Sequence, residues 1–427
     1  MIAAPRVRRW PAAQGLAMAA CLLLLLVLAG CSTWRRPAEG GDEPLRARAV
    51  SMTKDGVTLS ATVPSKLESH RLLGANIGAV GVQPVWIEVH NGTAQSLALL
   101  RTGTDPDYFS PLEVAWSLHG WFTGGTNAKI DDWFNHVGFR NPIPPGESRS
   151  GIVFTNPARG TKLLNVDLLG NQHLVVFTLF LRVPDDSGDP DFSRSLFTYP
   201  DPVAVDYQDL ASLRAALERL PCCATDASSQ HSGDPLNGVA IGGLEDFGAA
   251  MVRRNYRRNQ EPFDDAQYVF GRVPDAVLRK QGQAGMVSPN WIRAWLAPFR
   301  YEGQAVYVLQ IGRPTGGRLL AAPAQSVLHE DVDEARNMVV QDSIYSEGLE
   351  KLGFVAGGGP VSRQQERSSL NGAKYFTDGL RAVMFFVTRP LSISDLEILD
   401  WVPLGKPAAT DAVGKDRHAA EDTAQTR

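Results

Sequence analysis

The run HLVVFTLFLRV, residues 173–183, predicts a central β-strand, because it consists almost entirely of β-branched, aromatic and leucine residues. Shorter runs of the same kind precede it at Val57–Val63, Val85–Val89 and Gly151–Phe154. Turn residues such as Asp55-Gly56 separate these runs. Short strands at turn-punctuated intervals are typical of sandwiches. We therefore expect an immunoglobulin-like β-sandwich over residues 47–203.

The rest of the chain mixes helix and strand patterns, which makes the expected fold class α+β overall. The predicted elements are a helix over Tyr207–Leu220, a strand over Leu236–Gly243, a helix over Leu244–Arg258, a strand over Tyr268–Arg272, a hairpin of Trp291–Leu296 and Ala305–Gly312 about Glu302-Gly303, a helix from His329 to Leu352 and a strand over Ala382–Val387. Residues 224–234 are small and polar, which predicts a linker. An α+β domain is expected over residues 204–402.

Four short segments of this second part carry a family resemblance. They are Gly233–Asn237, Tyr268–Arg272 with Asp275, Arg293–Trp295 and His329–Arg336. Residues 205–400 thereby resemble the bacterial LssY C-terminal domain family, which is named for a component linked with type I secretion. The resemblance implies an envelope-associated domain. Asn290, Trp291 and Ile292 stand where that family usually has histidines, which disfavours histidine-based chemistry.

The N-terminus has the pattern of an export signal. Arg6, Arg8 and Arg9 precede an apolar run over residues 16–28, which is too short for a comfortable transmembrane span. The ending Leu28-Ala29-Gly30-Cys31 resembles a bacterial lipobox. Residues 1–30 are therefore predicted to be a cleaved lipoprotein signal peptide and Cys31 the lipid attachment site, carrying palmitate or similar acyl chains. An uncleaved signal anchor is the alternative.

The segments that flank the two domains are polar. Residues 31–46 are rich in proline and glycine and predict a flexible tether, and residues 403–427 predict a disordered tail. Ser32 and Thr33 follow Cys31 without an aspartate, which by resemblance to Gram-negative sorting rules favours the outer membrane. We expect a lipid-anchored protein that faces the periplasm, with the lipid bilayer as its first partner.

Charge and cysteine content exclude several functions. The net charge is −4, and the only dense basic cluster, Arg253–Arg258, falls on a predicted amphipathic helix, so no nucleic-acid partner is expected. Cys222 and Cys223 are adjacent, and a disulfide between them would be strained. We expect reduced or partner-linked thiols there, and no zinc site, because no second Cys or His pair has suitable spacing.

One acidic cluster with a histidine offers the best candidate chemistry. His329, Asp331 and Asp333 could hold a divalent ion or act as acid and base, with Arg293 or Arg336 binding an anionic substrate. Acidic residues at a helix start also cap its free amides, and this interpretation is favoured. No cofactor or metal is expected. The favoured function is a non-catalytic binding or assembly component of the envelope with an unidentified envelope or secretion protein as partner; the alternative is a metal-dependent periplasmic hydrolase.

Overall fold

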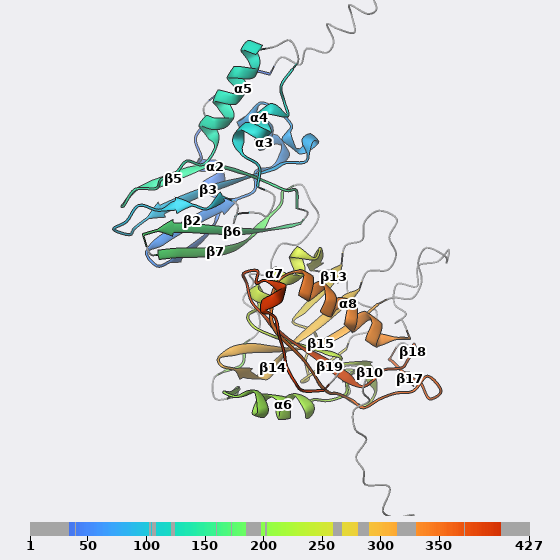
Figure 1. Ribbon diagram of the computed structural model, residues 1–427. Helices are drawn as coiled ribbons and strands as arrows, with labels where there is room; N and C mark the ends of the chain where they lie inside the picture. Colours follow the sequence, from blue (N-terminus) through green and yellow to red (C-terminus); the bar gives the residue numbers. More distant parts are fainter. Residues whose placement is uncertain are drawn as a thin grey trace, which may run out of the picture. The chain divides into compact units, whose positions relative to one another are not determined.

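The protein is a mixed α+β protein with more strand than helix. The computed structural model describes residues 34–38, 40–101, 104, 108–120, 124–158, 160–171, 173–184, 198–200, 203–258, 267–280, 290–313, 330–370 and 372–402. The chain forms two compact units (Figure 1). The first contains residues up to 158 and 165–177, and the second contains residues 159–164 and those from 178 onward. The boundary between the units falls inside the hairpin formed by residues 161–182, whereas the sequence pattern predicts a domain boundary after residue 203.

A four-stranded antiparallel sheet forms the centre of the first unit. Its strands, in spatial order, are β1 (Val50–Lys54), β2 (Val57–Thr62), β3 (Gln83–Asn91) and β5 (Ser148–Thr155). Asp55 and Gly56 join β1 to β2 with positive φ angles of 50° and 77°, as a tight two-residue hairpin requires. Val85, Ile87 and Val89 are all fully buried, as their alternation predicts. Trp86 between them is also buried, so both faces of β3 are covered.

A second sheet has the order β4 (Ala98–Leu99), β6 (Thr161–Gly170) and β7 (His173–Arg182). The prediction of a strand over 173–183 is confirmed, but its expected central position is wrong. In the part of the chain that the structure describes, β7 pairs with β6 alone and lies at an edge. The apolar pattern of β7 arises from burial of its side chains and not from strands on both sides.

Three helices of the first unit are absent from the predicted sandwich. They are α3 (Lys66–Leu73), α4 (Pro111–Trp116) and α5 (Gly124–Val137). The first two begin with capping boxes, in which Ser65 pairs with Glu68 and Ser110 with Glu113. Their side chains pack with β3 and β5 around Trp86, forming the core of this unit.

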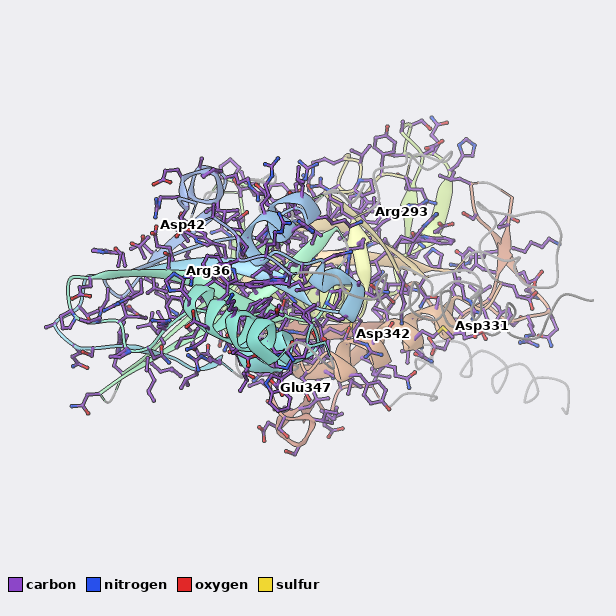
Figure 2. All side chains as sticks on the ribbon, turned by 90° about the horizontal axis from the view of Figure 1, so that it is seen from above. Arg36, Asp42, Arg293, Asp331, Asp342 and Glu347 are labelled. Carbon is purple, nitrogen blue, oxygen red and sulfur yellow. The ribbon has the colours of Figure 1, made fainter. Side chains whose placement is uncertain are left out.

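The predicted tether over residues 31–46 is wrong for the part that the structure describes. The Trp34 indole donates a hydrogen bond to the carbonyl of Leu73, 3.0 Å away. Arg36, labelled in Figure 2, lies over the Trp133 ring of α5 at 4.8 Å. Leu45, in helix α2 (Glu43–Arg46), is buried. These apolar and cation–π contacts hold the segment against the first unit despite its polar composition.

A nine-stranded sheet forms the second unit. Its path is β12 (Tyr256–Arg258), β13 (Ala276–Lys280), β14 (Trp291–Tyr301), β15 (Gln304–Gly312), β11 (Gly238–Ile241), β19 (Leu380–Phe386), β16 (Leu349–Ala356) and β20 (Glu397–Ile398), with β8 (Val205–Tyr207) beside β14. Helices α7 (Leu244–Arg253) and α8 (Val332–Tyr345) cover one face, and α6 (Leu210–Glu218) covers the other (Figure 1). Val239 and Ile241 pack on the α6 side, whereas Ala240 packs on the α7 and α8 side.

Several predicted elements of this unit are confirmed. The β14–β15 hairpin turns at Glu302 and Gly303, with φ of 48° and 76°. The predicted 207–220 helix is present as α6, although it begins at Leu210, because Asp209 is its N-cap. The predicted strand over 382–387 is β19.

Other predicted elements of this unit end earlier than expected or form a different structure, for local reasons. The helix predicted to reach Arg258 ends at Arg253, because Asn255 has a φ of 68° and the last residues form β12. The helix predicted to reach Leu352 ends at Tyr345, since Glu347 also has a positive φ. Residues 268–272 form a turn, in which the amide of Val269 donates to the carbonyl of Arg272.

The predicted linker over 224–234 is also wrong. Strand β9 (Cys223–Thr225) pairs with β10 (Ser232–Pro235) in a two-stranded sheet of their own. Among the described residues no helix combines the length and apolarity needed to cross a bilayer. The predicted signal peptide and Cys31 lie outside the described residues, as does the predicted tail.

Candidate functional site

The acidic cluster at the start of α8 is used to hold the helix in place. Asp331 is the N-cap: its Oδ1 accepts hydrogen bonds from the amides of Asp333 and Glu334, at 3.2 and 3.1 Å. Asp333 accepts from the Thr377 hydroxyl at 2.7 Å and from the Asp378 amide at 2.6 Å. Burial raises the pKa of Asp333, against the opposing effect of nearby Arg336. His329 lies outside the described residues.

Arg336 is fully buried and paired within the protein. Its Nη1 and Nη2 donate to the two carboxylate oxygens of Asp378, and Nη1 also donates to the carbonyl of Leu380 at 2.9 Å. The guanidinium lies over the Phe354 ring. This side chain joins α8 to the loop before β19, so it is not presented to an external anion.

Arg293 has a similar role on β14. Its Nη1 donates to Asp234 Oδ2 and to Gln310 Oε1, both at 3.0 Å. Asp234 also accepts a hydrogen bond from the Ser369 hydroxyl. Arg293 and Asp234 are only 2% exposed, which makes their ion pair a buried one. The described residues contain no group of three or more His, Cys, Asp or Glu side chains that could hold a metal.

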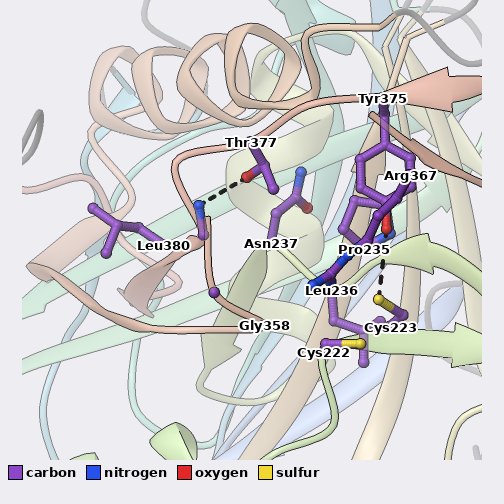
Figure 3. Close-up of a pocket in the computed structure, with 12 residues that line it drawn as sticks. Cys222, Cys223, Pro235, Leu236, Asn237, Gly358, Arg367, Tyr375, Thr377 and Leu380 are labelled. Atoms are coloured by element: carbon purple, nitrogen blue, oxygen red, sulfur yellow. Dashed lines mark hydrogen bonds between the residues drawn. The ribbon is translucent and has the colours of Figure 1, made fainter. Parts of the chain in front are cut away.

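A different site forms around the adjacent cysteines, in a narrow pocket of the second unit (Figure 3). It has room for about one water molecule. The lining residues are Cys222, Cys223, Pro235, Leu236, Asn237, Gly358, Gly359, Arg367, Tyr375, Thr377, Gly379 and Leu380. They come from the residues after α6 and the start of β9, from the end of β10 and the two residues before β11, and from the segment between β16 and the first residue of β19. The pocket is therefore assembled from segments far apart in the sequence.

The two cysteines are thiols with different surroundings. Cys223 is buried, and its Sγ lies 3.6 Å from the Tyr375 hydroxyl, whereas Cys222 is half-buried. A hydrogen bond from Cys223, opposed by burial and supported by the charges of Arg367 and Arg381, lowers the pKa of Cys222 to about 6. The same hydrogen bond, together with burial, raises the pKa of Cys223. Of the two sulfurs, Cys222 is therefore the one that more readily carries negative charge.

Arg381 fixes the chain beneath this pair. Its guanidinium donates to the carbonyls of Leu236 at 2.8 Å and Leu217 at 2.9 Å, and it also binds the Pro221 carbonyl. Burial lowers the pKa of Arg381 to about 10, so the group remains a cation at neutral pH. The positive charge behind Cys222 is consequently permanent.

Gly358 closes the pocket beside Cys222. A Cβ atom at residue 358 would lie 2.3 Å from the Cβ of Cys222, so only glycine fits there without movement of the chain. Sequence reasoning noted the adjacent cysteines but not Arg367, Tyr375 or Arg381. The one local signal is the position of the pair directly after Pro221, which stops α6.

Comparisons with known proteins give no family assignment. A comparison with protein-family models finds none that matches the chain, and a search of curated proteins finds no matching sequence.

Proposed function

We propose that this protein is an acylated lipoprotein of the bacterial cell envelope, attached through Cys31, which holds its first unit directly against the bilayer. In this proposal the protein is a non-catalytic binding or assembly component that faces the periplasm, with the outer membrane as its location. The sequence support is the signal pattern that ends in Leu28-Ala29-Gly30-Cys31.

The observation that carries the proposal is the docked position of Trp34. Only Ser32 and Thr33 separate it from Cys31, and the three chain steps between Cys31 and Trp34 reach at most about 10–11 Å when extended. Trp34 donates to Leu73 at the end of α3, and Gly74 next to it leaves room for the indole. An acylated Cys31 would therefore keep this end of the first unit within about 10 Å of the lipid headgroups.

The surface near Trp34 suits such a position. Arg35 and Arg71 are exposed there, and cationic side chains are attracted to anionic headgroups. Leu67 on the outer side of α3 is 60% exposed, which gives an apolar side chain that can enter the headgroup region. These features favour a unit that lies on the membrane over one that extends from it on a long linker.

The finer fold assignments are part of this proposal. The four-stranded sheet and the β4–β6–β7 sheet form an elaborated immunoglobulin-like sandwich, to which α3, α4 and α5 have been added. The second unit is an LssY-like domain, and the resemblance connects it with secretion. Sandwiches of this type present loops to partners but supply no chemistry by themselves.

A hydrolase is the weaker candidate. Asp331, Asp333 and Arg336 bond to backbone and side chains of their own unit. A hydrolytic site needs such groups converging on a cavity, and their internal bonds give that candidate no support.

Replacement of Cys31 by serine tests the attachment. The wild-type protein should sediment with membranes, and the Cys31→Ser protein should appear in the soluble fraction. Retention of the variant on membranes would show that an uncleaved signal segment holds it. Crosslinking of the wild-type protein in detergent-solubilised membranes, followed by affinity capture, tests the binding role; recovery of this chain alone would count against it.

A further inference from the structure

The pocket at Cys222 has no part in the function proposed above, and it combines four groups that suit thiol chemistry. Cys222 is half-buried and lines the pocket, whereas Cys223 is buried and contacts Tyr375. Arg367 lines the same pocket and is exposed at its surface. Arg381 lies behind with its charge buried. In Figure 3, Arg367 and Tyr375 stand over the two sulfur atoms.

Hydrogen bonds and positive charge surround the pair. Cys223 Sγ lies 3.6 Å from the Tyr375 hydroxyl, and Cys223 also bonds to Cys222. The bond from Cys223, together with the charges of Arg367 and Arg381, favours the thiolate of Cys222, which is the less buried of the two residues. A thiolate in a positive, partly exposed environment is the reactive form of cysteine.

We propose that Cys222 exchanges with small acidic disulfides and holds one half of them in the pocket as a mixed disulfide. The Cys222 thiolate attacks one sulfur of the ligand, whose S–S bond breaks while a new S–S bond forms to Cys222 Sγ. The other half of the ligand leaves as a thiolate and takes a proton from water. The ligand disulfide is the oxidant in this step, so no further reactant is needed.

The geometry also determines what happens after this step. Cys223 is the nearest thiol, but a disulfide between adjacent residues forces a strained ring. Cys223 therefore positions the thiolate and does not displace the ligand from it. The adduct persists until an external thiol removes it, which makes Cys222 a covalent docking site and not a turnover catalyst.

The size and charge of the pocket select the ligand. Because the space holds only about one water molecule, no more than the attacked sulfur of the ligand enters, and the rest of the ligand stays at the surface. Arg367 is there to pair with a carboxylate. The inference rests on the second unit alone, so it stands or fails independently of the membrane attachment.

The test uses the full chain with Cys21→Ser and Cys31→Ser, which leaves Cys222 and Cys223 as its only thiols. The folded protein is incubated at neutral pH with glutathione disulfide, which is acidic, or with cystamine, which is basic. Peptide mapping by mass spectrometry should find a single mixed disulfide on Cys222. Arg367→Ala should slow the reaction with glutathione disulfide about 3- to 10-fold and should not slow the reaction with cystamine.

Several results would overturn the inference. They are an adduct on Cys223, an absence of adducts on the folded chain while the urea-unfolded chain reacts, or loss of the adduct with closure of a Cys222–Cys223 disulfide. If Arg367→Ala slows the reactions with glutathione disulfide and with cystamine equally, Arg367 does not make the pocket prefer acidic ligands. Mapping of the chain with both native thiols assigns the reacting sulfur even where a cysteine variant fails to fold.

Discussion

Arg336 and Asp378 form a two-pronged ion pair, with Nη1–Oδ1 and Nη2–Oδ2 distances of 2.8 and 2.9 Å, around a guanidinium that is fully buried. Removal of Asp378 takes away one of the two carboxylates that neutralise this guanidinium, because Asp333 Oδ1 remains 3.3 Å from Nη1. Asp378→Ala should therefore lower the free energy of unfolding of the second unit by about 1–3 kcal/mol, the cost of losing hydrogen bonds to a buried charged group. Urea denaturation of both proteins, followed by tryptophan fluorescence, measures this loss in the free energy of unfolding.

A matched control for that variant is Glu334→Ala. Glu334, also on α8, pairs at 2.7 Å with Arg313, which directly follows β15, but both side chains are solvent-accessible. Its loss should cost about 0–1 kcal/mol. If the two variants unfold at the same urea concentration, the Arg336 pair does not hold α8 to the loop before β19.

The reactivity of Cys222 should follow its lowered pKa. The rate of alkylation by iodoacetamide should rise with pH through a midpoint near 6. In Cys223→Ser the thiol donor, the largest cause of the shift, is replaced, so the midpoint should change. Cys222→Ser removes the hydrogen bond and the charge that contribute to the raised pKa of Cys223, but Cys223 stays buried, so it should react more slowly than Cys222 does in the wild type. A wild-type midpoint near that of an ordinary cysteine would contradict the assigned environment.

The same shift affects folding. Because the Cys222 pKa is lower in the folded than in the unfolded chain, the unfolded chain binds more protons between about pH 6 and 9. The contribution of Cys222 to stability should grow as pH rises through this window and disappear as pH falls through 6. Denaturant unfolding of wild type and Cys222→Ser at about pH 6 and at about pH 9 measures this contribution as the difference in their free energies of unfolding. An equal difference at both ends would show that the Cys222 pKa is not lowered by folding.

Gly358→Ala tests how closely the pocket is packed. The added methyl group would lie 2.3 Å from the Cβ of Cys222, so the chain must move, and overpacking of this kind costs about 1–3 kcal/mol. We expect a lower melting temperature and altered alkylation of Cys222. Gly124→Ala, at a position with nothing within 4 Å of the added carbon, is the control and should melt as the wild type does.

Local patterns in the sequence account for the strands and for the cap at Asp331. Strands such as β3 and β14 have enough β-branched and aromatic residues to be recognised alone. The helices of the first unit could have been found from the Ser65–Glu68 and Ser110–Glu113 spacings, but short helices with proline and mixed polarity resemble loops. The turn residues Asn255 and Glu347 adopt positive φ for tertiary reasons, which no periodicity reveals.

The candidate pocket was less predictable than the fold. Cys223 and Tyr375 are 152 residues apart, and Arg381 reaches the α6 end from a strand still further along the chain. Pairing of β11 with β19 brings these segments together, and no local sequence signal encodes that pairing. Arg293 and Arg336 look like ligand-binding residues in the sequence. Each forms a structural ion pair with an aspartate that lies far away along the chain, Asp234 and Asp378 respectively, so these pairs could not be predicted from local sequence.

Docking of Trp34 should protect the N-terminal segment from proteolysis. Trp34→Ala removes the hydrogen bond to Leu73 and the packing beside Gly74. Trypsin should then cleave after Arg35 about tenfold faster than in wild type, because cleavage requires the segment to leave the surface. An unchanged cleavage rate would mean that residues 34–38 are already open in solution.

The central claim is that acylated Cys31 holds the α3 end of the first unit at the bilayer. The direct test places a dye at Arg71→Cys, in a protein with Cys222→Ser and Cys223→Ser, and measures energy transfer to headgroup-labelled lipid in vesicles. The control dye is at Asp55→Cys, in the turn at the far end of β2, which is six residues or about 20 Å long. The account predicts strong transfer from residue 71 and weaker transfer from residue 55. Equal and weak transfer from both positions would contradict it and would show that the unit stands away from the membrane.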